Sequence, residues 1–357
     1  MKKFLLCLGA AGLLLTACEN DSKNTSEEQE IDMSDFYVYT DEGVSTAAKG
    51  ISSGDESKNC ETMGVLNRQL NENPGLAKKM FDIEYHTRKF MAAEGNLNVA
   101  STGGDVSTAA AVDSDVDVLP AQDGLGTITI PVNVIIVNKD ASIVTDAQVA
   151  AQIERLNSDF ANEATEQLPS GTTFENDRSN TQIQFTLYNI ERHNNNKKFW
   201  GTRDAVKTSY PPTSPTTIMN LWVCDISKSI LGYAQFPGGN PATDGIVVTT
   251  GAFGPTSGNY NLGRTATHEV GHYLNLRHIW GDGGCTQDDF VLDTPPSDRS
   301  NGGCPSYPTV HCDTPDMTMN FMDYTYDRCM YMFTDGQRNR MRAIFASGGP
   351  RAAMVGN

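Results

Sequence analysis

Three histidines and a glutamate between residues 268 and 278 have the types and spacing of a catalytic metal site. His268 and His272 are four apart, so on a helix both imidazoles project from one face and can bind one ion. Glu269 lies beside that face, where it can hold a water without binding the metal. His278 is out of phase with the same helix, so the chain must turn before it. Three neutral imidazoles leave one zinc position open, as a catalytic site requires.

The turn before the third histidine falls at Asn275. Asparagine is the commonest non-glycine residue in the left-handed conformation that ends helices. An HExxH pattern that reaches a third histidine, with glycine at the turn and a downstream Met-turn, is the metzincin signature. Asn275 departs from the glycine, whereas Met322 supplies a downstream methionine within residues 320–324. The alternative is a buried helix whose histidines only form hydrogen bonds, but metal binding accounts for all four residues at once.

The elements that must position these residues begin near residue 127. The apolar run from Ile128 to Val137 predicts a buried strand, and Thr145 begins a helix with one apolar stripe. The helix that carries the histidines begins near Arg264. Further strands are expected over residues 183–187, 218–226 and 245–250. This order predicts a mixed sheet with helices packed on it, an α/β or α+β domain over residues 127–357.

The N-terminus has the pattern of a bacterial export signal. Two lysines precede an apolar run, Phe4 to Leu15, that is too short to span a membrane as a mature helix. Residues 15–18, Leu-Thr-Ala-Cys, resemble a lipobox in which Cys18 is lipidated and becomes the first mature residue. We therefore expect a signal peptide over residues 1–17 and a lipoprotein on the outer membrane or cell surface, or a protein secreted after processing. The alternative is an ordinary secretory signal. Either one permits disulfides.

Two segments separate this signal from the catalytic domain. Residues 18–58 are polar and acidic, which predicts a flexible tether. Residues 59–126 are expected to form a pro-segment, with a helix that starts near Asn73-Pro74 and presents Leu76, Met80, Ile83 and Phe90. Its last part, residues 92–126, is rich in small and polar residues and predicts an exposed, cleavable linker.

The charge of the chain limits its partners. The formal net charge is −17, and no basic stripe with interleaved aromatic residues occurs. These features argue against nucleic acid as a partner. An acidic surface mainly promotes solubility. The membrane remains a partner through the lipid at Cys18, and one acyl modification holds less firmly than a spanning helix.

Four cysteines cluster after the metal motif: Cys285, Cys304, Cys312 and Cys329. Four cysteines allow three pairings, and the sequence alone does not choose among them. Disulfides here would staple a C-terminal region that is rich in loops and has little apolar periodicity. A second zinc site is disfavoured because no CxxC pair is present. Cys224 falls within an expected strand and is interpreted as a buried free thiol.

Cys60 stands apart from the other cysteines, ahead of the expected helix of the pro-segment. A thiolate is a strong zinc ligand and could take the open metal position. The alternative is a surface thiol without a role.

Acidic residues gather just after the third histidine, in a loop that contains glycine and precedes Thr294. They are Asp282, Asp288, Asp289 and Asp293. Several carboxylates together with loop carbonyls are what calcium prefers. The alternative is a solvated acidic loop.

The metal motif, residues 320–324, residues 329–334 and the four clustered cysteines together resemble the pappalysin family of metzincins. The resemblance covers about residues 127–345. It implies a metzincin-like catalytic domain with a twisted mixed sheet. It further implies that His268, His272 and His278 bind zinc and that Glu269 is the general base. By the same resemblance, Met322 forms the floor under the metal and Tyr324 lies near it.

The resemblance also implies roles for the cysteines and the acidic loop. The disulfides would be Cys285–Cys312 and Cys304–Cys329. Cys60 would be a cysteine switch that holds the metal in a latent chain. Calcium would bind Asp289 and the carbonyl of Thr294.

These observations predict a zinc endopeptidase that hydrolyses peptide bonds in proteins and is made as a zymogen. Glu269 would take a proton from the attacking water, and the Tyr324 phenol could donate to the developing oxyanion. The competing hypothesis is a surface adhesion or binding module with a structural zinc site, in which Cys60 is a permanent ligand. Glu269 argues against it, because a closed site needs no base. Asp327 and Arg328 leave the charge preference for substrate open.

Overall fold

The computed structural model describes residues 30–40, 60–93, 123–163 and 171–356. The chain divides into two units after Asp32, and the second unit, Met33–Asn357, contains every helix and strand named below. The expected signal peptide, its lipidation site at Cys18 and the linker up to residue 122 lie outside the described residues. Within the described ranges, no helix is long and apolar enough to cross a membrane.

A five-stranded mixed sheet forms the centre of the catalytic part, in the order β2-β1-β3-β5-β4. Its strands are β1 (Ile128–Asn138), β2 (Ile183–Asn194), β3 (Met219–Val223), β4 (Gly232–Ala234) and β5 (Ile246–Val248). All neighbours pair in parallel except β4, the edge strand, which runs antiparallel to β5. The sheet confirms the expected mixed α/β architecture, whereas the three-residue β4 was not predicted because a strand this short has no detectable periodicity.

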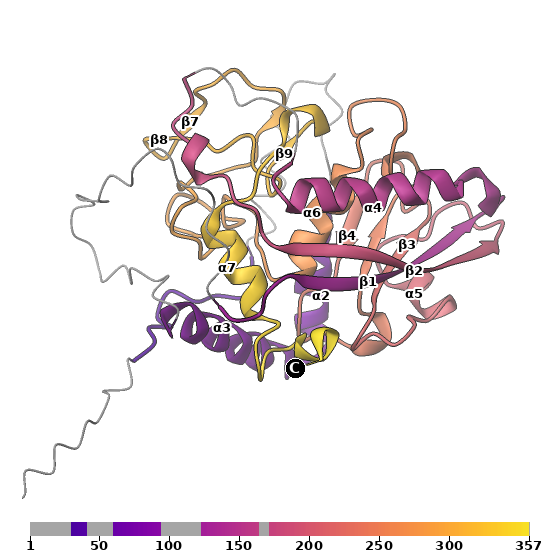
Figure 1. Ribbon diagram of the computed structural model, residues 1–357, viewed down its shortest axis with the longest axis horizontal. Coiled ribbons are helices and arrows are strands. Elements are labelled where there is room, and N and C mark those ends of the chain that lie inside the picture. Colours follow the sequence, from indigo (N-terminus) through magenta and orange to yellow (C-terminus); the bar gives the residue numbers. More distant parts are fainter. Residues whose placement is uncertain (1–29, 41–59, 94–122, 164–170, 357) are drawn as a thin grey trace, which may run out of the picture. The chain divides into compact units, whose positions relative to one another are not determined.

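Helices pack on this sheet and on one another. They are α2 (Thr62–Glu72), α3 (Leu76–Ala93), α4 (Asp146–Phe160), α5 (Ala205–Ser209), α6 (Arg264–Tyr273) and α7 (Asp335–Ala343). Helix α4 packs against β2 and against α6, and α6 also contacts β4 and β5 (Figure 1). Short 3-10 turns lie between the main elements, at Ala141–Ile143, Glu175–Asp177, Pro241–Thr243, Thr250–Ala252, Asp327–Cys329 and Ala352–Val355.

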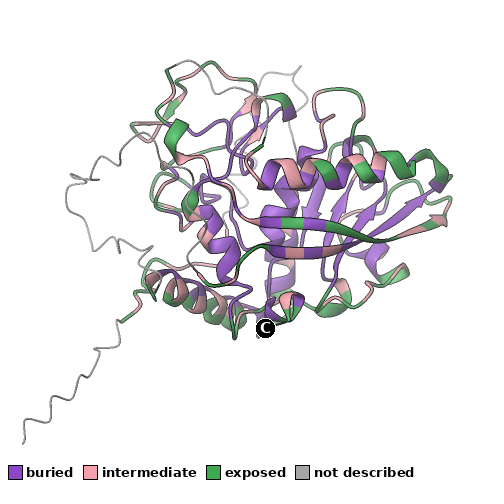
Figure 2. Ribbon diagram, viewed as in Figure 1, coloured by how far each residue is buried: buried purple, intermediate pink, exposed green. Residues whose placement is uncertain are grey.

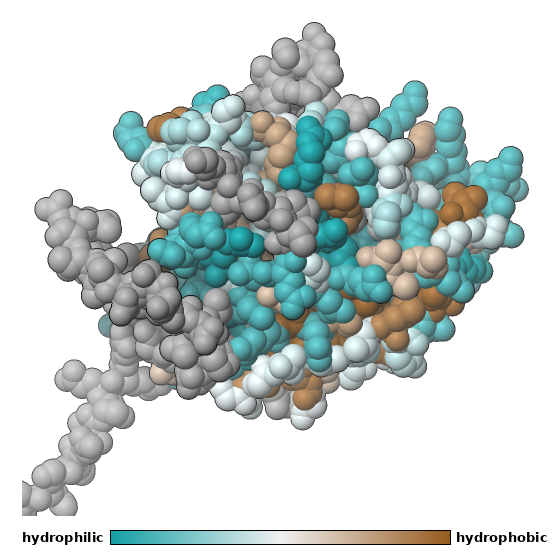
Figure 3. All heavy atoms as spheres, turned by 45° about the horizontal axis from the view of Figure 1, so that its top comes forward, coloured by the Kyte–Doolittle hydropathy of each residue, from teal (hydrophilic) through white to brown (hydrophobic). Residues whose placement is uncertain are grey.

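The hydrophobic core lies between the sheet and these two helices. The apolar stripe of α4 is buried as its spacing predicts, at Val149, Ile153, Leu156 and Phe160. Thr145 caps this helix by accepting a hydrogen bond from the Gln148 amide. Figure 2 shows burial along the inner strands and α6, and exposure along the edge strand β2 and on the outward side of α4. The face seen in Figure 3 is mostly hydrophilic, as expected for a net charge of −17.

The region after α6 consists largely of loops joined by two disulfides. Cys285 bonds Cys312 and Cys304 bonds Cys329, the pairing that the resemblance implies. The strands here have two residues each: β6 (Gly302–Gly303), β7 (Val310–His311), β8 (Thr314–Pro315) and β9 (Tyr324–Thr325). Covalent links therefore fix a region whose regular structure is too sparse to do so.

Residues 60–93, here called the N-terminal helical segment, continue the edge of the sheet. Cys60 forms a parallel bridge with Gly232 of β4, and the Glu61 amide donates to the Gly232 carbonyl at 3.1 Å. Helices α2 and α3 follow. The expected helix near Asn73-Pro74 is α3, whereas α2 was not predicted. Its buried side, which includes Leu66 and Leu70, contacts Phe236 just beyond β4.

Residues 33–40 pack against the catalytic part, which differs from the flexible tether expected over residues 18–58. The Tyr37 hydroxyl donates to the carbonyls of Gly281 at 2.5 Å and Asp288 at 2.8 Å. The Arg277 guanidinium donates to the Tyr37 carbonyl at 2.6 Å and lies over the Tyr37 ring. These contacts join residues more than two hundred positions apart in the chain. Composition alone could not reveal them and therefore predicted a flexible segment.

Glu84 ties α3 to α7 through a buried ion pair. Its carboxylate accepts hydrogen bonds from Arg340 at 2.8 and 3.0 Å and from Arg88 at 2.8 Å. Burial by itself would raise the pKa of Glu84, but the two guanidinium groups outweigh it and lower the pKa to about 2. The ionised pair therefore holds the N-terminal helical segment on the catalytic part.

We predict that acid weakens this docking through Glu84. The pKa of Glu84 falls from an ordinary 4.5 to about 2 on folding, so the stabilisation is complete above pH 4.5 and is lost as the pH falls toward 2. The shift corresponds to about 3 kcal/mol. In melting curves between pH 5 and about pH 2, the Glu84→Gln variant should lose less stability than the native chain. Glu72→Gln, in an exposed pair with Arg68, is the control. Parallel curves for native chain and Glu84→Gln would contradict the assignment.

Candidate metal centre

Buried polar contacts fix the first turn of α6. The Asp327 carboxylate accepts hydrogen bonds from the amides of Leu262 at 2.8 Å and Arg264 at 3.2 Å. A carboxylate at this end of a helix also interacts favourably with the helix dipole. Asp159 of α4 accepts from the Thr267 hydroxyl at 2.7 Å and from the Arg264 guanidinium. These contacts fix the helix that carries His268 and His272. Asp327 and Arg328 left the charge preference for substrate open in the sequence. In the structure Asp327 is fully buried, whereas Arg328 is exposed and lies over the Tyr326 ring.

The last turn of α6 ends at Asn275, where the sequence predicts it. Asn275 has a φ of 77°, in the left-handed region. Its amide donates to the His272 carbonyl at 3.0 Å, and the Leu276 amide donates to the Gly271 carbonyl at 2.9 Å. This pair of bonds is a Schellman motif, which reverses the chain and satisfies the terminal carbonyls. The reversal carries His278 back toward the other two histidines.

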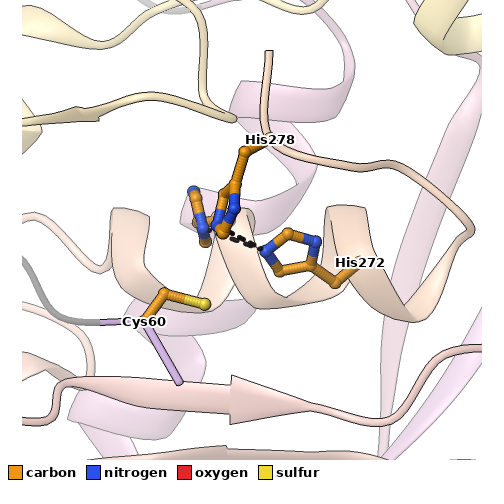
Figure 4. A group of neighbouring side chains, drawn as sticks. Cys60, His272 and His278 are labelled. Atoms are coloured by element: carbon orange, nitrogen blue, oxygen red, sulfur yellow. Dashed lines mark hydrogen bonds between the residues drawn. The ribbon is translucent and has the colours of Figure 1, made fainter. Parts of the chain in front are cut away.

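The structure brings the three histidines and Cys60 together. The Nε2 atom of His272 lies 3.1 Å from Nε2 of His268 and 3.1 Å from Nε2 of His278. The Cys60 sulfur and the three histidine nitrogens all lie within 4.8 Å of one another. In Figure 4 the Cys60 side chain points toward the rings of His272 and His278 from a separate segment. Within the described ranges, this is the one such group of potential metal ligands.

Each ring is oriented by a hydrogen bond at its other nitrogen. The Nδ1 partners are the Phe321 carbonyl for His268 at 2.7 Å, the Leu276 carbonyl for His272 at 2.8 Å and the Asp282 carboxylate for His278 at 2.5 Å. A carbonyl only accepts, so Nδ1 of His268 and His272 carries the proton and Nε2 presents its lone pair. Three imidazole nitrogens and one sulfur are a donor set that suits a tetrahedral zinc ion.

Met322 lies directly beneath α6, at Gly271. A Cβ atom added at Gly271 would clash with the Met322 sulfur, so glycine lets this side chain pack closely against the helix. Met322 is fully buried, and its amide donates to the Asn320 side chain at 2.9 Å. The Phe321–Met322 peptide group is therefore fixed at both ends, because its amide donates to Asn320 and its Phe321 carbonyl orients His268.

Tyr324 lies beside the metal ligands. Its ring centroid is 5.0 Å from that of His278 and 4.8 Å from that of Trp280. Its hydroxyl donates to the Cys60 carbonyl at 3.3 Å. Burial, and then the neighbouring Cys60 side chain, raise the pKa of Tyr324 well above its ordinary value, so the phenol keeps its proton. A protonated phenol beside the ligands can donate to a neighbouring oxyanion.

Glu269 faces the N-terminal helical segment. One carboxylate oxygen accepts a hydrogen bond from the Thr62 hydroxyl at 2.7 Å and one from the Cys60 thiol at 3.5 Å. Burial, and then the charge of this carboxylate, raise the pKa of Cys60 well above its ordinary value. The backbone of β4 passes so close that a Cβ at Gly232 would lie 2.7 Å from Glu269. Thr62 and Gly232 were not predicted, and the only available signal was the position of Thr62 two residues after Cys60.

Each of the four carboxylates in the acidic loop makes a local contact; Asp288 accepts a hydrogen bond from the Phe290 amide at 2.6 Å, and Asp289 accepts one from the Val291 amide at 3.1 Å. Asp282 binds His278, and Asp293 accepts from the Thr334 hydroxyl at 2.6 Å and the Gly336 amide at 2.8 Å, where α7 begins. Asp289 is buried, and its carboxylate accepts hydrogen bonds from the Thr294 hydroxyl at 2.8 and 3.0 Å. The predicted calcium residues are therefore adjacent.

Comparisons with known proteins agree with this site. The family model described as pregnancy-associated plasma protein-A, peptidase family M43, matches residues 214–346. An extracellular metalloprotease of Arthroderma otae is 35% identical over 207 residues, which are 56% of this chain and 70% of that protein. Mature mirolysin of Tannerella forsythia, solved with a cleaved peptide, is 38% identical with a TM-score of 0.61 and covers 64% of this chain and 96% of its own. A promirolysin mutant is 32% identical with a TM-score of 0.68 and covers 84% of this chain and 97% of its own.

The fold and the cluster of histidines define a metalloprotease with a metzincin-type catalytic domain. The chain belongs to the pappalysin family, peptidase family M43. The family implies a catalytic metal, and the four ligand atoms are where it would bind.

Proposed function

We propose that the chain is a zinc endopeptidase made as a latent zymogen, in which residues 59–126 are the pro-segment and Cys60 is the switch. The observation that carries this proposal is the position of the Cys60 sulfur among the three histidine nitrogens. His268, His272 and His278 would hold zinc, and the thiolate would take the position that a catalytic site leaves open. The longer coverage of this chain by promirolysin than by mature mirolysin, 84% against 64%, supports a zymogen.

In the active form, bound zinc supplies Lewis acidity toward the scissile carbonyl and the attacking water. Glu269 takes the proton of that water and passes it to the leaving amine. Its burial against β4 keeps it within reach of a peptide extended along that strand. The Tyr324 phenol donates to the oxyanion, and His278 beside it keeps the phenol close to the ligands. Met322 supports α6 from below and keeps its histidines in place.

The latent form blocks the base as well as the metal. The Thr62 hydroxyl donates to Glu269 and itself accepts from the Ala234 amide at 2.8 Å, so β4 holds Thr62 over the base. The parallel bridge between Cys60 and Gly232 occupies the sheet edge along which a peptide substrate would add. Removal of the pro-segment would free the metal position, the base and the edge strand together.

The competing function is a surface adhesion module with a permanent structural zinc site. In that case Cys60 would remain bound, and Glu269 would have no chemical task. The discriminating comparison therefore uses full-length chains, because it asks whether loss of the thiol releases proteolysis that depends on Glu269.

We predict that Cys60→Ala activates itself at least about tenfold faster than the native chain, because losing a zinc ligand removes more than the ~1.4 kcal/mol that a tenfold change requires. The measurement is cleavage of a fluorescent protein substrate over time, together with loss of the pro-segment on gels. Cys224→Ala, at the other free cysteine of the described residues, is the matched control.

The double variant Cys60→Ala/Glu269→Ala should bind zinc and cleave nothing. Unchanged latency in Cys60→Ala would refute the switch. Proteolysis that survives the double substitution would show that Glu269 is not the base.

Export and lipid attachment at Cys18 are further parts of the proposal. The relatives are named extracellular metalloproteases, which supports export. The lipobox at residues 15–18 supports a membrane anchor on the outer membrane or cell surface. An acylated N-terminal peptide that begins at Cys18, found by mass spectrometry of the membrane fraction, is the expected sign. An unmodified mature N-terminus elsewhere would contradict it.

The last part of the proposal is a calcium ion bound by Asp289 and Thr294. Burial, and then the neighbouring Asp288, raise the pKa of Asp289 well above its ordinary value, and a bound cation would relieve this repulsion. We expect a chelator selective for calcium to lower the melting temperature by a few degrees while zinc is retained, as about 1 kcal/mol would do. Asp289→Asn should abolish the response, whereas Asp313→Asn, an exposed acid, should keep it. No response in the native chain would contradict the site.

A further inference from the structure

The three zinc-binding histidines differ in what holds their second nitrogen. His268 and His272 donate to backbone carbonyls, whereas His278 faces the carboxylate of Asp282 at 2.5 Å. A carboxylate acceptor strengthens the hydrogen bond and makes the opposite nitrogen a better donor to metal. Unlike the other two histidines, His278 lies outside α6. The orientation of its ring therefore depends most on side-chain contacts.

The backbone at Asp282 is shaped to return this carboxylate to His278. Gly281 and Asp282 both have left-handed φ angles, 61° and 59°. A Cβ at Gly281 would lie 2.7 Å from the Asp288 amide nitrogen, so the tight turn needs glycine there. The Tyr37 hydroxyl donates to the Gly281 carbonyl at 2.5 Å and so holds the same turn. Aspartate is one of the few non-glycine residue types that adopt this conformation readily, so both residues suit the turn.

His278 is the one hydrogen-bond partner of the Asp282 side chain within the part of the chain that the structure describes. Its Oδ1 atom meets Nδ1 of His278, and its Oδ2 atom is buried without a hydrogen bond from a described residue. Asp282 is 5% exposed. Burying a carboxylate costs free energy, and among the described residues only the hydrogen bond with His278 offsets that cost for Asp282. Trp280 stacks on the His278 ring at 4.3 Å and leaves the carboxylate to set its rotation.

We propose that Asp282 is a positioning residue for the third zinc ligand, and that it orients His278 and strengthens its bond to the metal. The inference rests on the proposed zinc site. It assigns the first acidic residue of the loop to zinc and separates it from the calcium residues. Asp282 touches neither substrate nor zinc and acts through His278.

The test measures zinc release from the full-length chain to a chromophoric chelator. Asp282→Gly removes the carboxylate and keeps a left-handed backbone without strain, while Asp282→Asn keeps an acceptor oxygen without charge. Zinc release should be about 10 to 100 times faster in Asp282→Gly, with Asp282→Asn between it and the native chain. Asp288→Asn, an exposed acid of the same loop, is the matched control and should match the native chain.

A second readout separates positioning from a structural effect. With cobalt in place of zinc, the visible absorption bands should shift in both Asp282 variants and stay unchanged in Asp288→Asn, while the circular dichroism of all chains agrees. Native release rates and native cobalt bands in Asp282→Asn and Asp282→Gly would overturn the inference. If Asp282→Gly does not fold, Asp282→Asn decides. A native chain that binds no zinc would instead refute the proposed function.

Discussion

The structure depends on one constraint, which is that three imidazole nitrogens on two separate segments must point at one position. Two of the rings come from α6, and the third is returned by the Schellman turn at Asn275. Hydrogen bonds at Nδ1 then fix the rotation of each ring. Since an imidazole binds metal along its lone pair, a small rotation would misdirect it. The surrounding elements supply the acceptors for these hydrogen bonds.

Two of the three groups that accept hydrogen bonds from the histidines lie outside α6 and its terminal turn, in the disulfide-linked region. That region is therefore part of the site. The Phe321 carbonyl orients His268 and precedes Met322, whose sulfur contacts Gly271. Asp282 comes from the loop that contains Cys285. The disulfides therefore stabilise loops that orient two metal ligands, one through a backbone carbonyl and one through a side-chain carboxylate. Such loops have little regular structure, so covalent links replace the ladder hydrogen bonds that would otherwise fix them.

The edge strand β4 connects catalysis and latency. Gly232 brings its backbone against Glu269, and Cys60 pairs with that same residue. A sheet edge offers unpaired amides and carbonyls to any extended chain, which suits a substrate in the active enzyme and the pro-segment in the latent one. Glu84 of the pro-segment adds an ion pair with Arg340, and Tyr37, which precedes the pro-segment, adds contacts with Arg277. The chain ahead of the catalytic part is therefore held by more than Cys60.

The sequence was informative where the signal was local. The spacing of His268 and His272, the turn at Asn275 and the apolar stripe of α4 each follow from a periodicity or a conformational preference within a few residues. The sheet order, β4 and the contacts of Thr62 do not, because they join positions far apart in the chain. Asp282 was read as part of an acidic loop, since its left-handed backbone and its direction toward His278 appear only in three dimensions. Residues 33–40 looked disordered for the same reason.

Zinc K-edge X-ray absorption of the full-length, zinc-loaded chain tests the central claim most directly. The account predicts one sulfur neighbour at about 2.3 Å and three imidazole nitrogens at about 2.0 Å. The sulfur should be absent in Cys60→Ala and after removal of the pro-segment, with the three nitrogens retained. A latent chain whose zinc has no sulfur neighbour, or has fewer than three imidazoles, would contradict the account.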